Sequence, residues 1–100
     1  MADVSTYDFG TKKLGAWVDK SSSYAAQQAA TDGFVLALYG SGGSFQGYTD
    51  ANSNPTTVRA VCGSAGDANS KQIMFPVRKG DYWKVDATPS AVYWLPLGAA

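Results

Sequence analysis

The side chains that most enzymes use for catalysis are scarce in this sequence. It contains no His and no Glu, and Cys62 is its one cysteine. A Ser-His-Asp triad, a Cys-His pair and a His-based zinc site are therefore impossible. Two Asp residues could form an acid–base pair, but all eight lie in or beside predicted turns, where Asp is common. The sequence therefore predicts a protein that is not an enzyme and uses no metal or cofactor.

One segment has the beginning of a calcium-loop pattern. Residues 50–54 (DANSN) follow the D-x-N-x-N spacing of such a loop. The sixth position requires Gly but holds Pro55, and the twelfth holds Val61 where Glu is needed. These departures favour an Asx-rich turn over a calcium site.

Charge and hydropathy exclude several classes of partner. The formal net charge is zero, with eight basic and eight acidic residues and no basic cluster, so nucleic-acid binding is not expected. The longest apolar run, Phe34–Tyr39, is far too short to span a bilayer, so membrane insertion is not expected. Residues 1–13 have no apolar signal core, which predicts synthesis in the cytoplasm without a signal peptide.

Turn residues divide the chain into short segments typical of an all-β protein. Residues 1–13 are expected to be a lead-in segment and residues 14–100 one β-sandwich domain. The Ala/Gln-rich stretch 24–31 could be helical, but its shortness favours a strand. The expected strands are Leu14–Val18, Tyr24–Ala30, Phe34–Tyr39, Ser44–Thr49, Thr56–Cys62, Gln72–Val77, Asp81–Ala87 and Ala91–Leu97.

Two turns have a defined chemistry. Thr31-Asp32-Gly33 predicts a tight turn in which Gly33 adopts a positive φ. Arg78-Lys79-Gly80 predicts a three-residue hairpin that again ends on glycine. Cys62 is expected to pack as a small apolar residue within its strand.

The alternation of side chains separates two kinds of strand. Residues 72–77 and 82–86 alternate apolar and polar side chains, as strands with one solvated face do. Strands 34–39 and 91–97 are apolar on both faces. A lone two-layer sandwich has no second core for an outer apolar face. Either loops or the N-terminal segment cover this face, or the two strands lie side by side in a contact between subunits.

Three segments carry a resemblance to a known family: TDGFVLALYG at 31–40, PVRKGDYWKV at 76–85 and VYWLPLG at 92–98. In order and spacing they resemble the small trimeric head domains of phage tail fibres, which are similar in fold to TNF-like and complement-type jelly rolls. Such heads have a (P/T)-(S/T)-D-G-(F/W/Y) turn, a (V/I)-P-V-(K/R)-K-G-D turn and an aromatic strand ending near P-L. The chain departs from this pattern at Ala30-Thr31, where a proline is frequent.

The resemblance implies an antiparallel, TNF-like jelly-roll β-sandwich of about eight strands. It also implies a homotrimer in the virion, with the sheet of the first, eighth, third and sixth strands facing the three-fold axis. The periodicity alone does not determine which face of each strand meets the partner. The residues expected at the trimer interface are Trp17, Val35, Ala37, Tyr39, Tyr93, Leu95 and Leu97.

The expected function is binding of a host surface glycan or protein. Eight antiparallel strands bring both termini to one end, so the loops 19–23, 40–43, 63–70 and 86–90 would point away from a fibre shaft. The candidate receptor-binding residues in these loops are Ser22, Ser41, Gly42, Ser64, Asp67, Asn69, Asp86 and Thr88. Two alternatives remain open: a monomeric carbohydrate-binding module that uses aromatic side chains such as Tyr48 and Tyr82, and a structural capsid decoration protein.

Overall fold

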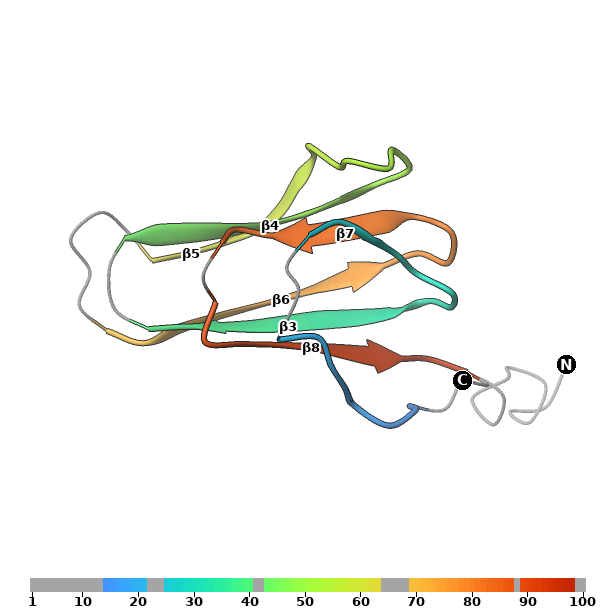
Figure 1. The fold of residues 1–100 in the computed structure, drawn as a ribbon, viewed down its shortest axis with the longest axis horizontal. Coiled ribbons are helices and arrows are strands. Elements are labelled where there is room, and N and C mark those ends of the chain that lie inside the picture. Colours follow the sequence, from blue (N-terminus) through green and yellow to red (C-terminus); the bar gives the residue numbers. More distant parts are fainter. Residues whose placement is uncertain (1–13, 22–24, 41–42, 64–68, 88, 99–100) are drawn as a thin grey trace, which may run out of the picture.

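Two antiparallel sheets of four strands each pack against one another (Figure 1). The computed structural model describes residues 14–21, 25–40, 43–63, 69–87 and 89–98. These residues contain strands and turns but no helix, and therefore no helix that could cross a membrane. The predicted all-β sandwich is confirmed.

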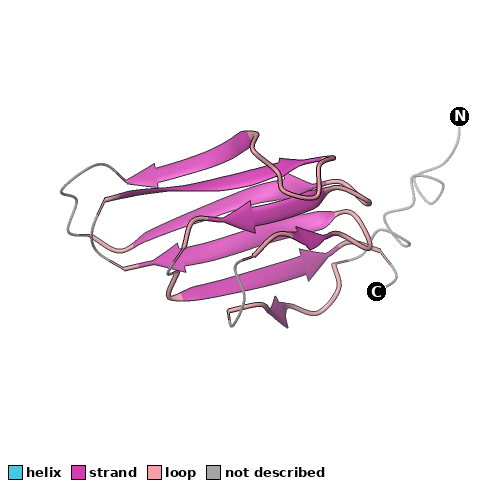
Figure 2. Cartoon of the chain, turned by 45° about the horizontal axis from the view of Figure 1, so that its top comes forward, coloured by secondary structure: helices cyan, strands magenta, loops and turns pink. Residues whose placement is uncertain are grey.

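Each sheet combines strands from both halves of the chain. The first sheet has the order β1-β8-β3-β6, and the second has the order β2-β7-β4-β5 (Figures 1 and 2). The strands of the first are β1 (Val18–Asp19), β8 (Ala91–Pro96), β3 (Gly33–Tyr39) and β6 (Lys71–Val77). Those of the second are β2 (Gln27–Gln28), β7 (Tyr82–Val85), β4 (Ser44–Asp50) and β5 (Val58–Gly63). The Ala/Gln-rich stretch thus contributes a short strand, as expected.

The core lies between the sheets and is filled by alternate residues of each strand. In β6, Ile73, Phe75 and Val77 are buried while Gln72, Met74 and Pro76 are exposed, as the alternation predicts. Trp83 and Val85 of β7 are buried in the same way. The indole of Trp83 stacks on that of Trp94 at a centroid distance of 6.1 Å, which joins the two sheets. Cys62 is partly buried and packs against this core.

The pairing of β3 with β8 confirms that the two doubly apolar strands lie side by side. Their register runs antiparallel from Gly33 opposite Pro96 to Leu38 opposite Ala91. On its other edge, β3 pairs with β6 from Gly33 opposite Val77 to Tyr39 opposite Lys71. β3 is thus an inner strand, and its backbone is hydrogen-bonded on both sides.

The segment Arg78-Lys79-Gly80 is not a hairpin turn, so this prediction was wrong. The strands that it links, β6 and β7, belong to different sheets. The amide of Asp81 donates to the carbonyl oxygen of Arg78 at 3.0 Å, and Gly80 has a φ of +88°. A tight turn that ends on glycine was therefore predicted correctly, but this turn leads the chain from one sheet to the other instead of joining two paired strands.

Gly33 is needed for space and not for a left-handed backbone, contrary to the prediction. It is the first residue of β3 and is not among the described glycines with positive φ. A Cβ atom at this position would lie 2.6 Å from the carbonyl oxygen of Leu95 and 2.6 Å from the indole of Trp94. Only glycine allows β8 to approach β3 this closely.

The two ends of the described chain meet at one end of the sandwich. Leu14 forms an antiparallel bridge with Leu97, and the amide of Gly15 donates to the carbonyl oxygen of Pro96 at 2.7 Å. The links β2–β3, β4–β5 and β6–β7 lie at this same end, whereas β3, β5 and β7 finish at the opposite end (Figure 1). The ends of β3, β5 and β7 agree with the predicted sidedness of the three loops that follow them, and residues 22–23, 41–42, 64–68 and 88 of the predicted loop regions lie outside the described residues.

Candidate functional site

The outward side of the β1-β8-β3-β6 sheet is almost entirely apolar, and we call it the outer face. Cross-strand register arranges its side chains in rows. The rows are Leu95-Phe34-Pro76, Tyr93-Leu36-Met74 and Ala91-Leu38-Gln72. Trp17 extends the outer face beyond β8, where its ring meets that of Tyr93 edge-on at 6.3 Å. Among these residues Gln72 is polar, and Asp19 of β1, which pairs with Tyr93, adds an exposed carboxylate at the edge of this face.

Much of this face remains accessible in the single chain. Trp17 is 50% exposed and Met74 is 51% exposed. Phe34, Leu36 and Leu38 are all half-buried. Large apolar side chains that share one sheet face mark a contact surface more often than an ordinary solvated surface.

Three of the residues expected at the interface are instead in the core. Val35 and Ala37 have no accessible surface, and Tyr39 is 2% exposed. They point toward the second sheet, so their side chains cannot meet another subunit. The error arises because both sides of β3 are apolar, and period-two alternation separates the two sets without identifying the inner one. On this strand the outward set is Phe34, Leu36 and Leu38.

The remaining expected interface residues lie at the surface or close beneath it. Tyr93 and Leu95 belong to the outer face, with Tyr93 half-buried and Leu95 only 6% exposed. Trp17 lies next to them, before the edge strand β1. Leu97 is half-buried at the end of the sandwich, where it bridges Leu14. The structure therefore brings together Trp17, Tyr93 and Leu95 from the predicted set.

Most of the expected receptor-binding residues lie outside the described residues. This applies to Ser22, Ser41, Gly42, Ser64, Asp67 and Thr88. Asn69 is exposed just before β6, at the end of the sandwich away from residues 14 and 98. Asp86 follows β7 at that same end and is half-buried.

Asp86 organises hydrogen bonds within the domain, which the prediction of a receptor-binding role did not anticipate. Its carboxylate accepts hydrogen bonds from the amide of Gln46 and the hydroxyl of Tyr48, both at 2.8 Å. Its backbone carbonyl accepts a hydrogen bond from the hydroxyl of Tyr39. Desolvation and, second, the Asp86 charge raise the pKa of Tyr39, so this phenol remains a donor. Asp86 therefore ties β7 to β3 and β4.

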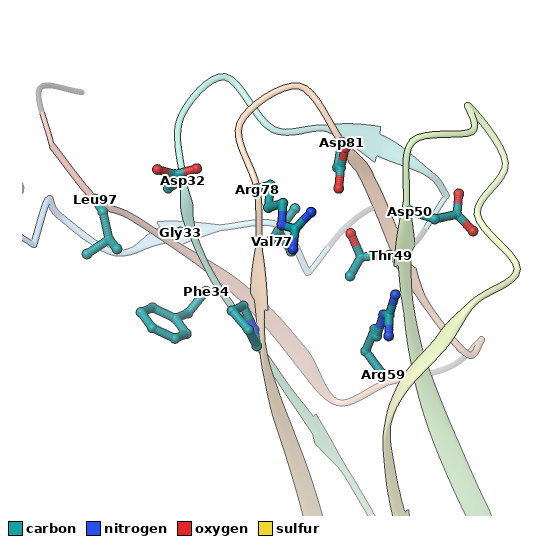
Figure 3. Close-up of a pocket in the computed structure, with 11 residues that line it drawn as sticks. Asp32, Gly33, Phe34, Thr49, Asp50, Arg59, Val77, Arg78, Asp81 and Leu97 are labelled. Carbon is teal, nitrogen blue, oxygen red and sulfur yellow. The ribbon is translucent and has the colours of Figure 1, made fainter.

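A cavity of about 630 Å³ lies at the opposite end, beside the described ends of the chain (Figure 3). We call it the arginine cavity, because Arg59 and Arg78, the only two arginines of the sequence, both line it. The other lining residues are Asp32, Gly33, Phe34, Thr49, Asp50, Pro76, Val77, Asp81 and Leu97. Sequence reasoning did not find this site, since its charged residues come from four separate segments of the two sheets.

Asp50, on the rim of this cavity, holds the loop that joins β4 to β5. Its carboxylate accepts hydrogen bonds from the amides of Asn52, Thr56 and Thr57 and from the hydroxyl of Thr57. Desolvation, the largest single influence, raises the pKa of Asp50. The hydrogen bonds together outweigh this effect and lower the pKa to about 2. The segment 50–54 is thus an Asx-rich turn.

Asp50 makes the stability of the domain sensitive to acid. A carboxyl group with a lowered folded-state pKa stabilises the fold above its unfolded value of 3.8, and this stabilisation is lost as the pH falls toward about 2. We expect Asp50→Asn to lower the melting temperature at neutral pH, and the difference from the wild type to shrink between pH 4 and 2. Thermal unfolding followed by circular dichroism across this range tests the expectation. A difference that does not change with pH would contradict it.

The described residues offer no cluster of three or more His, Cys, Asp or Glu side chains that could hold a metal ion. Comparisons with protein-family models, curated proteins and solved structures found no match to this chain. Its function must therefore be inferred from two surfaces of its own, the outer face and the arginine cavity.

Proposed function

We propose that this chain is a non-enzymatic head domain of a virion appendage, such as a phage tail fibre, that trimerises and binds a receptor on the host cell surface. The observation that carries the proposal is the apolar outer face. Phe34, Leu36 and Tyr93 lie in adjacent positions of it with no second layer of the described chain above them. Covering these side chains with other copies of the chain removes apolar surface from water, which favours association.

The strand order supports the TNF-like jelly-roll part of the proposal. The first, eighth, third and sixth strands share one sheet, and the second, seventh, fourth and fifth share the other. Every link except β4–β5 crosses from one sheet to the other. Such crossing between two antiparallel four-stranded sheets is typical of double Greek-key sandwiches.

Apolar side chains at both edges of the domain support a ring of subunits. A closed ring with a rotation axis needs two different surfaces on each copy. Leu14, Trp17 and Val18 are exposed at the β1 edge, and Val58, Val61 and Met74 are exposed on β5 and β6 at the other edge. One edge of each copy can therefore pack near the outer face of the next, and three copies close the ring.

The position of the described ends supports a receptor contact at the far end of the head. Residues 14 and 98 lie at one end, so a shaft joined there leaves the ends of β3, β5 and β7 pointing outward. Asn69 is exposed at this far end. A glycan is the favoured receptor because short Asn, Asp and Ser side chains in such loops suit hydroxyl recognition.

The test of the proposal is a charge placed in the middle of the outer face. We expect Leu36→Asp to convert a trimer into a folded monomer, because an unpaired carboxylate in an apolar interface costs several kcal/mol. Sedimentation velocity measures the mass, and circular dichroism verifies that the monomer keeps its strands. Binding to an array of bacterial surface glycans then separates a receptor-binding head from a structural trimer.

A matched control places the same charge on the other sheet. Ser44 is exposed at the start of β4 and is not part of the outer face. Ser44→Asp is therefore expected to leave the trimer intact. A wild-type chain that stays monomeric at high concentration, or a Leu36→Asp variant of unchanged mass, would contradict the proposal.

A further inference from the structure

Both arginines of the sequence line one cavity, although they are far apart in the chain. Arg59 belongs to β5 of the second sheet, and Arg78 follows β6 of the first. Figure 3 shows their guanidinium groups directed toward the same part of the cavity. Guanidinium groups are the side chains best suited to hold carboxylate or phosphate oxygens, because they donate two parallel hydrogen bonds.

The backbone fixes the position of each arginine. Gly47 pairs with Ala60 and Tyr48 pairs with Val58, so Arg59 is the extra residue of a β-bulge and has no partner across the strands. A bulge of this kind turns a side chain away from its regular direction. Arg78 begins the tight β6–β7 turn, in which its carbonyl oxygen accepts a hydrogen bond from the amide of Asp81. The β-bulge at Arg59 and the tight turn at Arg78 therefore place both guanidinium groups at the same cavity.

The carboxylates of the cavity do not pair with these arginines within the part of the chain that the structure describes. Asp50 is held by the four hydrogen bonds of its own loop, and Asp32 accepts a hydrogen bond from the amide of Lys79 at 2.8 Å. Within the part of the chain that the structure describes, neither guanidinium group makes an ion pair or a hydrogen bond. Their capacity to bind an oxyanion thus remains available.

The rest of the lining suits a ligand that is more than a simple anion. Phe34, Pro76 and Leu97 supply an apolar side, and Phe34 and Pro76 are direct cross-strand partners. Asp81 adds a half-buried carboxylate that can accept hydrogen bonds from hydroxyl groups. An apolar surface beside a carboxylate that accepts hydrogen bonds suits a sugar ring, because such a ring has an apolar face and hydroxyl groups around it.

We infer that the arginine cavity binds an oxyanion carried on a hydroxylated ring, either the carboxylate of an acidic sugar or the phosphate of a sugar phosphate. Arg59 and Arg78 hold the anionic group, and the carboxylate of Asp81 accepts hydrogen bonds from the ring hydroxyls. This inference goes beyond the proposed trimer, because one chain supplies every group of the cavity.

The test is a titration of the isotope-labelled wild-type chain with three ligands, in which NMR measures the chemical shifts of the backbone amides. Glucuronate presents the carboxylate, glucose 6-phosphate presents the phosphate, and glucose lacks the anion. We expect saturable shifts at the cavity residues with one or both of the anionic sugars, and none with glucose. The ligand that binds identifies which oxyanion the site takes. Arg59→Gln and Arg78→Gln are each expected to weaken binding about tenfold or more, as loss of a charged hydrogen bond does.

Lys79 provides the matched control. It is exposed in the same turn as Arg78, its side chain does not line the cavity, and Lys79→Gln makes the same change in net charge. This variant should bind the anionic sugar as the wild type does. The inference is overturned if neither anionic sugar binds saturably, if glucose binds equally well, or if Lys79→Gln weakens binding as much as Arg78→Gln. The mass of the chain in solution reports separately on the trimer.

Discussion

Replacing Val35 with Asp is expected to leave the chain unable to fold, whereas Leu36→Asp, one residue further along β3, leaves a folded domain. Val35 has no accessible surface and lies opposite Phe75 on one side and Trp94 on the other. A carboxylate at this position has no partner and loses its hydration, at a cost of several kcal/mol. The free energy of unfolding of a domain this size is only about 5–15 kcal/mol, so most of it would be lost.

Circular dichroism and thermal unfolding of the two variants measure this contrast. Val35→Asp should lack a cooperative transition, and Leu36→Asp should keep one. Val35→Ala serves as the neutral control and should fold with a loss of about 2 kcal/mol, because it removes apolar contacts without adding a charge. A stable Val35→Asp domain would show that the inner side of β3 is assigned incorrectly.

The second large effect is expected at Trp83. This side chain is 2% exposed and stacks on Trp94 with an interplanar angle of 8°, so it fills the space between the two sheets. Trp83→Ala should lower the free energy of unfolding by about 3–5 kcal/mol, since truncation leaves a large cavity in the core. Urea unfolding followed by circular dichroism measures the loss.

Trp83→Phe distinguishes lost volume from a general intolerance of substitution at this position. It retains an aromatic ring on Trp94 and should be clearly more stable than Trp83→Ala. Equal destabilisation by the two variants would mean that the stacked indole pair, and not the filled volume, holds the sheets together.

For strands with one polar side, the set of buried side chains could be predicted from the sequence. In β6 the polar Gln72 identifies the solvent side, so Ile73 and Phe75 were placed correctly in the core. β3 carries no polar residue from Phe34 to Leu38, and both of its sides look equally suited to a core. The burial of Val35 depends on the second sheet that covers it, and local alternation contains no information about that layer.

The links between strands show a similar limit. The positive φ of Gly80 could be predicted because a tight turn requires it wherever the turn leads. Whether β6 and β7 pair after that turn depends on their neighbours, and here β6 pairs with β3 while β7 pairs with β2 and β4. Gly33 was misjudged for the same reason, since the indole that requires its missing Cβ lies about sixty residues away in sequence.

The arginine cavity could not be predicted because nothing in the local sequence connects Arg59 with Arg78. Arg59 lies in a strand with an irregular register, and Arg78 lies in the turn that leads from one sheet to the other. A β-bulge depends on the register in which two strands pair, so the sequence of either strand alone does not predict it. The one available signal was that the sequence has only two arginines, one in the middle of the predicted strand 56–62 and the other directly after the predicted strand 72–77.

The bridge between Leu14 and Leu97 has a mechanical consequence. The two ends of the described chain run antiparallel and leave the sandwich together, with β1 bonded to β8 over only two residue pairs. A force that pulls these ends apart loads the bonds of this short ladder one after another, like a zipper, and not all at once. β1 would peel away first and uncover Tyr93, while β3, β6 and the inner part of β8 would still carry the load of the domain.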